Sequence, residues 1–416
     1  MKFFGTVALC ACAFVWGALA YRGNLFPYPQ LRSAAVALGA LDLGREEAAP
    51  RGGRSARKRL ETLGYLQSAP VEADAAESGV VLANRQLSFD GLNLYKETGV
   101  STAHLIDNAG VEVYSWTMDQ GRWIHAELSP DDGALIGVSE EGFVFRLSAD
   151  SRLEWKTPAR AHHDLQVRSD GSIWALTRRD SRWPERYGDQ PIVEDTITVL
   201  SPQGELLREI SLLEPFRGSP YEYLLPAAEP STGQGKAYEL LHANHVEVFD
   251  GTLAHRSALF REGNLLVSFR TLNAVAILEK DSGRILWLWG PTNLSVQHHP
   301  SLLDNGNLLI FDNGYDESRV IEVAVPEGRI VWEYSAGPSF FSVWGGSVQR
   351  LPNGNTLITS SAQGSVFEVT PQGQTVWKFV NPRPVDDGGS ATSRPSRWNI
   401  WRMTRFPRSA LKFLDR

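Results

Sequence analysis

From about Ser88 onward, short apolar runs alternate with turns rich in Gly, Asp and Asn. Such runs are typical of β-strands, and a unit built from them repeats along the chain. Each plain copy predicts a turn, two strands, a second turn and a strand that carries a tryptophan. The three plain copies begin at Gly263, Gly306 and Gly354 and reach Trp287, Trp332 and Trp377. The copies begin about 40 to 50 residues apart, which is the length of a four-stranded propeller blade.

Three looser copies precede these, two of them ending near Trp116 and Trp155, so six units are counted. The strand-like segment Arg397–Phe406 is expected to close the ring against the first blade, because open sheet edges invite aggregation. The sequence therefore predicts an all-β fold, a six-bladed β-propeller over residues 85–408. A β-helix and a sandwich are the alternatives, and the regular Trp-ended unit favours the propeller.

The N-terminal 84 residues differ from this pattern. Lys2 precedes the apolar run Phe3–Ala20, which fits a membrane anchor or a signal peptide with the small-x-small site Ala18-Leu19-Ala20. A buried core helix is the third possibility, and we favour the uncleaved anchor. The expected location is periplasmic or otherwise extracytoplasmic, tethered to the inner membrane, or secreted after cleavage. Residues 21–84 predict a linker arm, with one possible short helix at Ser55–Leu66.

The composition excludes several kinds of ligand and site. The net charge of -7 gives no basic surplus for nucleic acid. The two cysteines, Cys10 and Cys12, both lie in the first apolar run. The rest of the chain therefore has no disulfide, no thiolate metal site and no cysteine nucleophile.

Histidines recur just before one strand of several units. They are His125, His162-His163, His242, His245 and His298-His299. Because the first strand of each blade lines the central channel, these positions are expected to converge. Strand alternation sends adjacent side chains to opposite faces, so at most one member of each pair should face the channel. His104 and His255 are isolated and are expected on the surface or in turns.

A histidine cluster can bind a transition metal, act as acid and base, or act as a nucleophile. Carboxylates at matching positions are scarce apart from Asp164 and Asp312, and Arg270 would repel a metal cation. Arg270 instead favours an anionic substrate such as a sulfate or phosphate ester. We therefore expect neither a metal nor a cofactor.

Four segments resemble the bacterial arylsulfotransferase family over roughly residues 85–408. They are HHDLQVRSDGSIWALTRR, LHANHVEVFDG with NLLVSFR, QHHPSLLDNGNLLIFDNG, and GSVQRLPNGNTLI with VFEVTPQGQTVWKF. The resemblance implies a six-bladed propeller that passes a sulfuryl group from an aryl sulfate to a phenol through a sulfohistidine, without a nucleotide sulfate donor.

Carried over by motif, His298 matches the nucleophile, and His242 and Arg270 match the pair that binds sulfate and assists proton transfer. His163 matches a further channel histidine, with His162 as its rival. The candidate substrate-binding residues are Asn244, His299, Asp312 and Asn313. The segment SVWGGSV has no histidine where other blades carry one.

Two other functions remain open. A non-enzymatic propeller would bind an anionic ligand, a glycan or an envelope protein at its channel mouth. A quinone-dependent dehydrogenase is the third reading, but such enzymes typically have eight blades and a divalent metal, and the sequence indicates neither.

Overall fold

The computed structural model describes residues 68–70, 77–119, 121–227, 238–383 and 396–415. Within them, no helix is long and apolar enough to cross a membrane. The expected anchor Phe3–Ala20 and the possible helix Ser55–Leu66 lie outside the described residues. Strand content dominates, as the alternating pattern predicted, and the one α-helix of the described part is the single turn α4 (Pro184–Tyr187).

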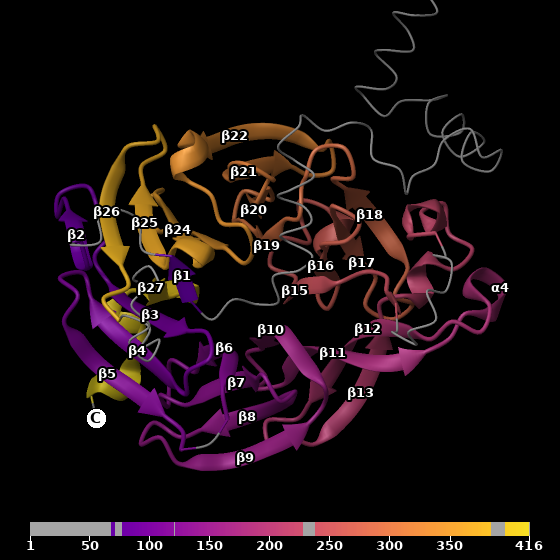
Figure 1. Cartoon of the computed structure of the whole chain (residues 1–416), viewed down its shortest axis with the longest axis horizontal. Coiled ribbons are helices and arrows are strands. Elements are labelled where there is room, and N and C mark those ends of the chain that lie inside the picture. The colour runs from indigo at the N-terminus through magenta and orange to yellow at the C-terminus, as the bar shows by residue number, and fades with distance from the viewer. Residues whose placement is uncertain (1–67, 71–76, 120, 228–237, 384–395, 416) are drawn as a thin grey trace, which may run out of the picture.

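Six sheets, antiparallel except for one short parallel pair, are arranged around a central axis in the described part of the chain, which confirms the six-bladed propeller (Figure 1). Strands are given from the innermost outward. The first blade contains β28 (Ile400–Phe406), β3 (Leu92–Glu97), β4 (Thr102–Asp107) and β5 (Glu112–Thr117), and the second contains β6 (Trp123–Leu128), β7 (Leu135–Ser139), β8 (Phe143–Leu147) and β9 (Leu153–Pro158). The third contains β10 (Ala161–Val167), β11 (Ile173–Ser181), β12 (Ile192–Leu200) and β13 (Leu206–Ser211), with β14 (Tyr238–Glu239) beside β12.

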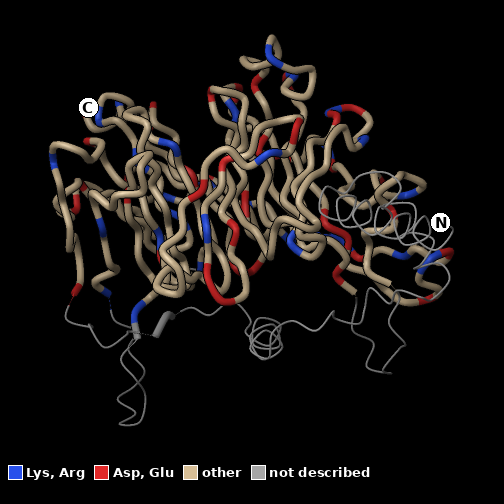
Figure 2. Tube along the Cα trace, turned by 90° about the horizontal axis from the view of Figure 1, so that it is seen from above, with Lys and Arg blue, Asp and Glu red and all other residues tan. Residues whose placement is uncertain are grey.

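The last three blades are β15 (Ala243–Val248), β16 (Leu265–Phe269), β17 (Ala274–Leu278), β18 (Ile285–Trp289); β19 (His298–Leu302), β20 (Leu308–Asp312), β21 (Arg319–Ala324), β22 (Arg329–Ser335); and β23 (Ser347–Arg350), β24 (Thr356–Ser360), β25 (Ser365–Val369), β26 (Thr375–Val380), β2 (Gly79–Ala83). A separate pair joins β1 (Ser68–Pro70) to β27 (Ser396–Trp398). Basic and acidic residues are interspersed along the described part of the trace (Figure 2).

The hydrophobic core lies between the blades. The buried apolar residues of the described chain form six clusters, and each cluster joins the facing sides of two neighbouring sheets. Both faces of every sheet are thus covered, which is why the strands contain long fully buried stretches such as LLVSF in β16 and AVAIL in β17.

The repeated tryptophan fastens five of the six blades to the next one, the exception being the third blade, whose strand β13 has no tryptophan. On the outermost strand, the indole N–H of Trp155 donates to Pro202 O, and that of Trp332 donates to Pro371 O, in turns of the following blade. Equivalent bonds join Trp116 to Gly133, Trp287 to Pro326, and Trp377 to Asn108. A buried or half-buried indole finds its required acceptor in this way. The feature that revealed the repeat in the sequence is therefore an inter-blade contact.

Both ends of the described chain close the ring. The C-terminal strand β28 pairs with β3, as predicted, with Met403 opposite Tyr95. The N-terminal strand β2 pairs with β26 of the last blade, with Gly79 opposite Val380. The sheet therefore includes residues before position 85, where the sequence pattern placed the propeller's start.

Arg405 holds this junction together. Its guanidinium pairs with Glu368 of the last blade, donates to Asn93 Oδ1 at 2.6 Å, and lies 4.5 Å from the ring of Trp377. The side chains of Arg405 and Glu368 are both fully buried. Removing one partner of a buried ion pair leaves an uncompensated charge, so this pair cannot be lost without cost.

We expect Arg405→Met to lower the free energy of unfolding by about 3 to 5 kcal/mol, because Glu368 would remain buried without its cation. Chemical denaturation monitored by circular dichroism measures this. The control is Lys412→Ala, which removes the exposed contact to Asp131 and should change stability by well under about 1 kcal/mol. Equal effects of the two substitutions would show that Arg405 does not hold the junction.

Candidate functional site

The innermost strands bring the sequence-predicted histidines into two groups. His162, His163, His242, His298 and Arg270 form one group, here called the histidine site. The second group, here called the polar ring, contains one residue from each blade: Arg402, His125, Asp164, His245, His299 and Ser347. The predicted convergence therefore occurs, but it gives two clusters instead of one.

Both members of each adjacent histidine pair are used, contrary to the alternation argument. His298 belongs to the histidine site, whereas His299 packs against His245 with ring centroids 4.7 Å apart. The reason is local. His163 and His299 have φ angles of 54° and 46°, in the left-handed region, and the ladders of β10 and β19 shift register at these positions. Such bulges re-aim side chains, so the period of two is broken.

The hydrogen bonds of His298 determine its tautomer. Its Nδ1 lies 2.7 Å from Asn313 Oδ1, and the Asn313 amide donates to Ser342 O and Gly345 O, each at 2.7 Å. Because both amide hydrogens are committed, Oδ1 accepts and His298 Nδ1 must donate. Burial and the nearby charge of Arg270 lower the pKa of His298 to about 3. The imidazole is therefore neutral, with a lone pair on Nε2.

A second relay orients His163. His162 Nε2 lies 3.2 Å from Thr177 O and 3.3 Å from Asp195 Oδ1, so this nitrogen carries the hydrogen. Burial lowers the pKa of His162, and its Nδ1 accepts from His163 Nδ1 at 2.7 Å. Burial, followed by the charges of His242 and Arg178, lowers the pKa of His163 well below its usual value. His163 is thus neutral, and its ring lies 4.9 Å from that of His242.

His242 is paired with a carboxylate that the sequence reasoning missed. Its Nδ1 lies 2.9 Å from Glu239 Oε2, and the other Glu239 oxygen lies 2.6 Å from Arg178 Nη2. Burial opposes the charged form of Glu239, but the contacts with His242 and Arg178 lower its pKa to about 2. Glu239 is ionised and accepts from His242 Nδ1, which fixes the orientation of the His242 ring. The only sequence signal is a Glu three residues before the histidine.

Arg270 follows β16, and its backbone N–H donates to His242 O at 3.2 Å. Its charge lowers the pKa of both His163 and His298. Asn244 donates to Gln297 O at 2.8 Å, next to His298, and its Oδ1 is buried without a hydrogen-bond partner among the described residues. Asn244 therefore retains an acceptor at the channel.

Asp312 takes a different role from its sequence assignment as a substrate-binding residue. One oxygen accepts from Ser295 N at 2.7 Å and the other pairs with Arg319 at 2.9 Å, so both oxygens are already engaged by the protein. Of the two isolated histidines, His255 is exposed as expected. His104 is not: it is buried on β4, 2.7 Å from Glu112.

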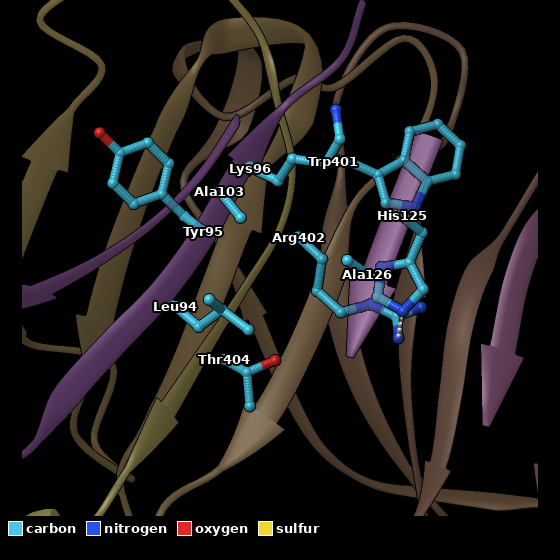
Figure 3. Close-up of a pocket in the computed structure, with 9 residues that line it drawn as sticks. All are labelled: Leu94, Tyr95, Lys96, Ala103, His125, Ala126, Trp401, Arg402 and Thr404. Atoms are coloured by element: carbon cyan, nitrogen blue, oxygen red, sulfur yellow. Dashed lines mark hydrogen bonds between the residues drawn. The ribbon is translucent and has the colours of Figure 1, made fainter. Parts of the chain in front are cut away.

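Arg402 connects the polar ring across the channel. Its guanidinium donates to His125 Nε2 at 3.2 Å and to Asp164 Oδ1 at 2.9 Å (Figure 3 shows Arg402 and His125). Asp164 Oδ2 lies 2.5 Å from His245 Nδ1. Despite burial, which opposes its charge, Asp164 has a strongly lowered pKa because of Arg402 and His245. Burial and then Arg402 lower the pKa of His125. The ring therefore holds the cation of Arg402 against the anion of Asp164.

A pocket of about 480 Å³ opens beside the histidine site. Its wall includes His162, His163, Trp401, Ile124 and Arg178. The ring of Trp401 lies 5.9 Å from that of His163 and is stacked at 29° on Trp344 behind it. This volume lies within the range of small-molecule sites, and a backed indole provides a flat apolar surface for an aromatic ligand.

A second, very small cavity of about 10 Å³ lies between the first two blades. His125, Arg402, Thr404 and Lys96 are among its lining residues (Figure 3). Burial lowers the pKa of Lys96 to about 7, and its ammonium donates to Val100 O at 3.1 Å. The cavity has room for about one water molecule, so it is not a substrate site.

Comparison with known proteins gives one family match. The family described as arylsulfotransferase (ASST) matches residues 156–382, which is more than half of the chain and includes His163, His242, Arg270 and His298. No curated protein sequence matches the chain.

Solved structures match at low identity. A protein of unknown function from Bacteroides caccae is 13% identical with a TM-score of 0.48, covering 76% of this chain and 99% of that one. A streptogramin B lyase is 13% identical with a TM-score of 0.42, covering 77% and 89%. Virginiamycin B lyase from Staphylococcus aureus is 12% identical with a TM-score of 0.38, covering 76% and 88%.

We expect His298 to remain a neutral Nδ1–H tautomer down to about pH 5, because burial and Arg270 disfavour the imidazolium. Nitrogen-15 NMR of histidine-labelled protein measures this. Asn313→Asp should raise the pKa of His298, since a carboxylate favours the charged ring. The control, Asn353→Asp in an exposed turn, should leave it unchanged. An Nε2–H tautomer at His298 would contradict the hydrogen-bond assignment.

Proposed function

Because this chain belongs to the arylsulfotransferase family and is therefore a sulfotransferase-type enzyme, we propose that it transfers a sulfuryl group from an aryl sulfate to a phenol through a sulfohistidine on His298. One observation supports the choice of His298 as the nucleophile. The Asn313 network leaves the lone pair on Nε2 of a neutral His298, whose pKa is lowered by burial and by the charge of Arg270. A neutral imidazole is a competent nucleophile, and a guanidinium stabilises charge on sulfuryl oxygens.

In the first half-reaction, His298 Nε2 attacks sulfur, the N–S bond forms and the bond between sulfur and the aryl oxygen breaks. His242, protonated on Nε2 and stabilised by Glu239, gives that proton to the departing phenolate. His298 keeps its Nδ1 hydrogen on Asn313, so the adduct is a sulfated imidazolium. Its positive ring makes it a good leaving group for the next step.

In the second half-reaction, a phenol enters the same site. The now neutral His242 takes its proton, the phenol oxygen attacks sulfur, and the N–S bond breaks. His298 returns to its starting tautomer and His242 to its protonated form, so protons balance over the cycle. The aryl group of each substrate would lie in the pocket beside Trp401, with its oxygen directed toward the histidine site.

His163 has a supporting place in this proposal. The relay through His162 leaves a lone pair on its Nε2, so in this tautomer it offers no hydrogen to a sulfuryl oxygen. Its ring lies between His242 and Trp401, where it would fix the position of the acid–base histidine relative to the aryl pocket.

The test is to treat the protein with 4-nitrophenyl sulfate and to follow nitrophenol release with and without a phenol. We expect His298→Ala to reduce turnover by about four orders of magnitude or more, as loss of a nucleophile commonly does. His255→Ala, at an exposed histidine, is the matched control. Mass spectrometry should locate one sulfuryl group on the peptide containing Gln297-His298. An adduct on the His162-His163 peptide, or full activity of His298→Ala, would overturn the assignment.

We also propose that Phe3–Ala20 exports the chain and anchors it to the membrane, on the basis of the apolar run led by Lys2. A reporter enzyme that folds only outside the cytoplasm, fused after Arg416, should be active. The control fusion lacks residues 3–20 and should be inactive. Activity of a cytoplasm-specific reporter on the full chain would contradict export.

A further inference from the structure

The polar ring occupies one level of the channel in all six blades. Backbone pairing shows this for five of the six members. His125, Asp164, His245, His299 and Ser347 each lie three residues before the last pair that joins the innermost strand to the next one, at Leu128, Val167, Val248, Leu302 and Arg350 respectively. Arg402 lies four residues before the corresponding pair at Phe406, and its contacts with His125 and Asp164 place its guanidinium at this level. Residues far apart in the sequence are therefore held at the same depth by the fold.

Contacts run from blade to blade around this level. Arg402 contacts both His125 and Asp164, so it reaches past the second blade to the third. Asp164 contacts His245, also accepting from Val246 N at 3.3 Å, and His245 packs on His299. His299 Nδ1 accepts from Val348 N of the last blade at 3.4 Å. Thr359 Oγ1 accepts from Met403 N at 3.1 Å and completes the circuit to β28.

The next level of the channel is bridged in the same way. Glu127, Gln166, Glu247 and Gln349 each accept a backbone N–H from the innermost strand of the following blade, at 2.5 to 3.0 Å. Two successive levels of side chains therefore connect neighbouring strands below the histidine site. The 480 Å³ pocket lies on the other side, at the level of His162 and His163.

We propose that the polar ring closes the channel beneath the histidine site and thereby makes a phenol, and not water, the acceptor of the sulfuryl group. This inference rests on the proposed sulfohistidine cycle. Water that reached the adduct would attack sulfur, form an S–O bond and break the N–S bond, giving hydrogen sulfate and a proton. A site open at one end is filled by the acceptor itself, whereas a second opening would admit water behind it.

Arg402 is the member chosen for removal, because its guanidinium contacts His125 of the second blade and also reaches past that blade to Asp164 of the third. Arg402→Met keeps the aliphatic stem and removes both cross-channel contacts. Asp164→Asn keeps the shape and removes the anion that Arg402 and His245 share. The matched control is Thr404→Val, an isosteric change on the same strand and on the same side of it, two residues beyond Arg402.

The measurement is the ratio of inorganic sulfate to sulfated phenol formed from 4-nitrophenyl sulfate at a fixed phenol concentration. Wild-type protein should release little sulfate, and its donor turnover should nearly stop without a phenol. Arg402→Met and Asp164→Asn should raise the ratio about tenfold or more, a change of about 1.4 kcal/mol in relative barriers. Thr404→Val should match wild type. Circular dichroism confirms that each variant is folded.

Outcomes separate the two proposals. Absence of any adduct on wild-type protein would refute the sulfohistidine cycle itself. Efficient transfer with an unchanged ratio in folded variants would refute the role of the ring alone. If neither variant folds, the wild-type measurement decides: donor turnover without a phenol at a rate comparable to that with one would show that the ring does not exclude water.

Discussion

The innermost strand of every blade has one edge that faces the channel and has no neighbouring strand to pair with. Backbone N–H groups on such an edge are costly when they are buried without partners. Here they are satisfied by side chains of the preceding blade, as Gln166 does for Val248 and His299 does for Val348. The channel must therefore be lined with hydrogen-bonding residues for the ring to exist at all.

The histidine site uses this requirement. A fold that already needs polar side chains along its axis can replace some of them with imidazoles without burying an unsatisfied group. His162 illustrates the exchange, because it accepts from His163 and donates to a backbone carbonyl while also supporting the site. Backbone strain lies at histidines of both groups: His163 and His242 of the histidine site and His299 of the polar ring all have left-handed backbone angles. Local strain of this kind tends to collect where geometry serves function.

Features carried by a sequence repeat or a local motif could be predicted from the sequence, whereas features made by contacts between distant residues could not. The Trp-ended repeat gave the blade count, and Arg397–Phe406 gave the closing strand. His298, His242 and Arg270 came from motifs. The bulges in β10 and β19 were not predicted, because nothing in the sequences HHD or HHP indicates a residue with a left-handed backbone conformation. Glu239 was not predicted either: its partner Arg178 lies on a strand 61 positions earlier, and only the fold brings them together. The outer strand β2 lacked the repeat's turn signals.

Closure by β28 has a consequence for the timing of synthesis. The pocket wall takes Trp401, and the polar ring takes Arg402, from the strand that is made last. Pairing of β28 with β3 joins segments separated by about three hundred residues, a contact of very long range that forms slowly. A chain released early has most of its blades but neither of these side chains. Such a chain therefore lacks one aromatic side of the pocket and one member of the polar ring.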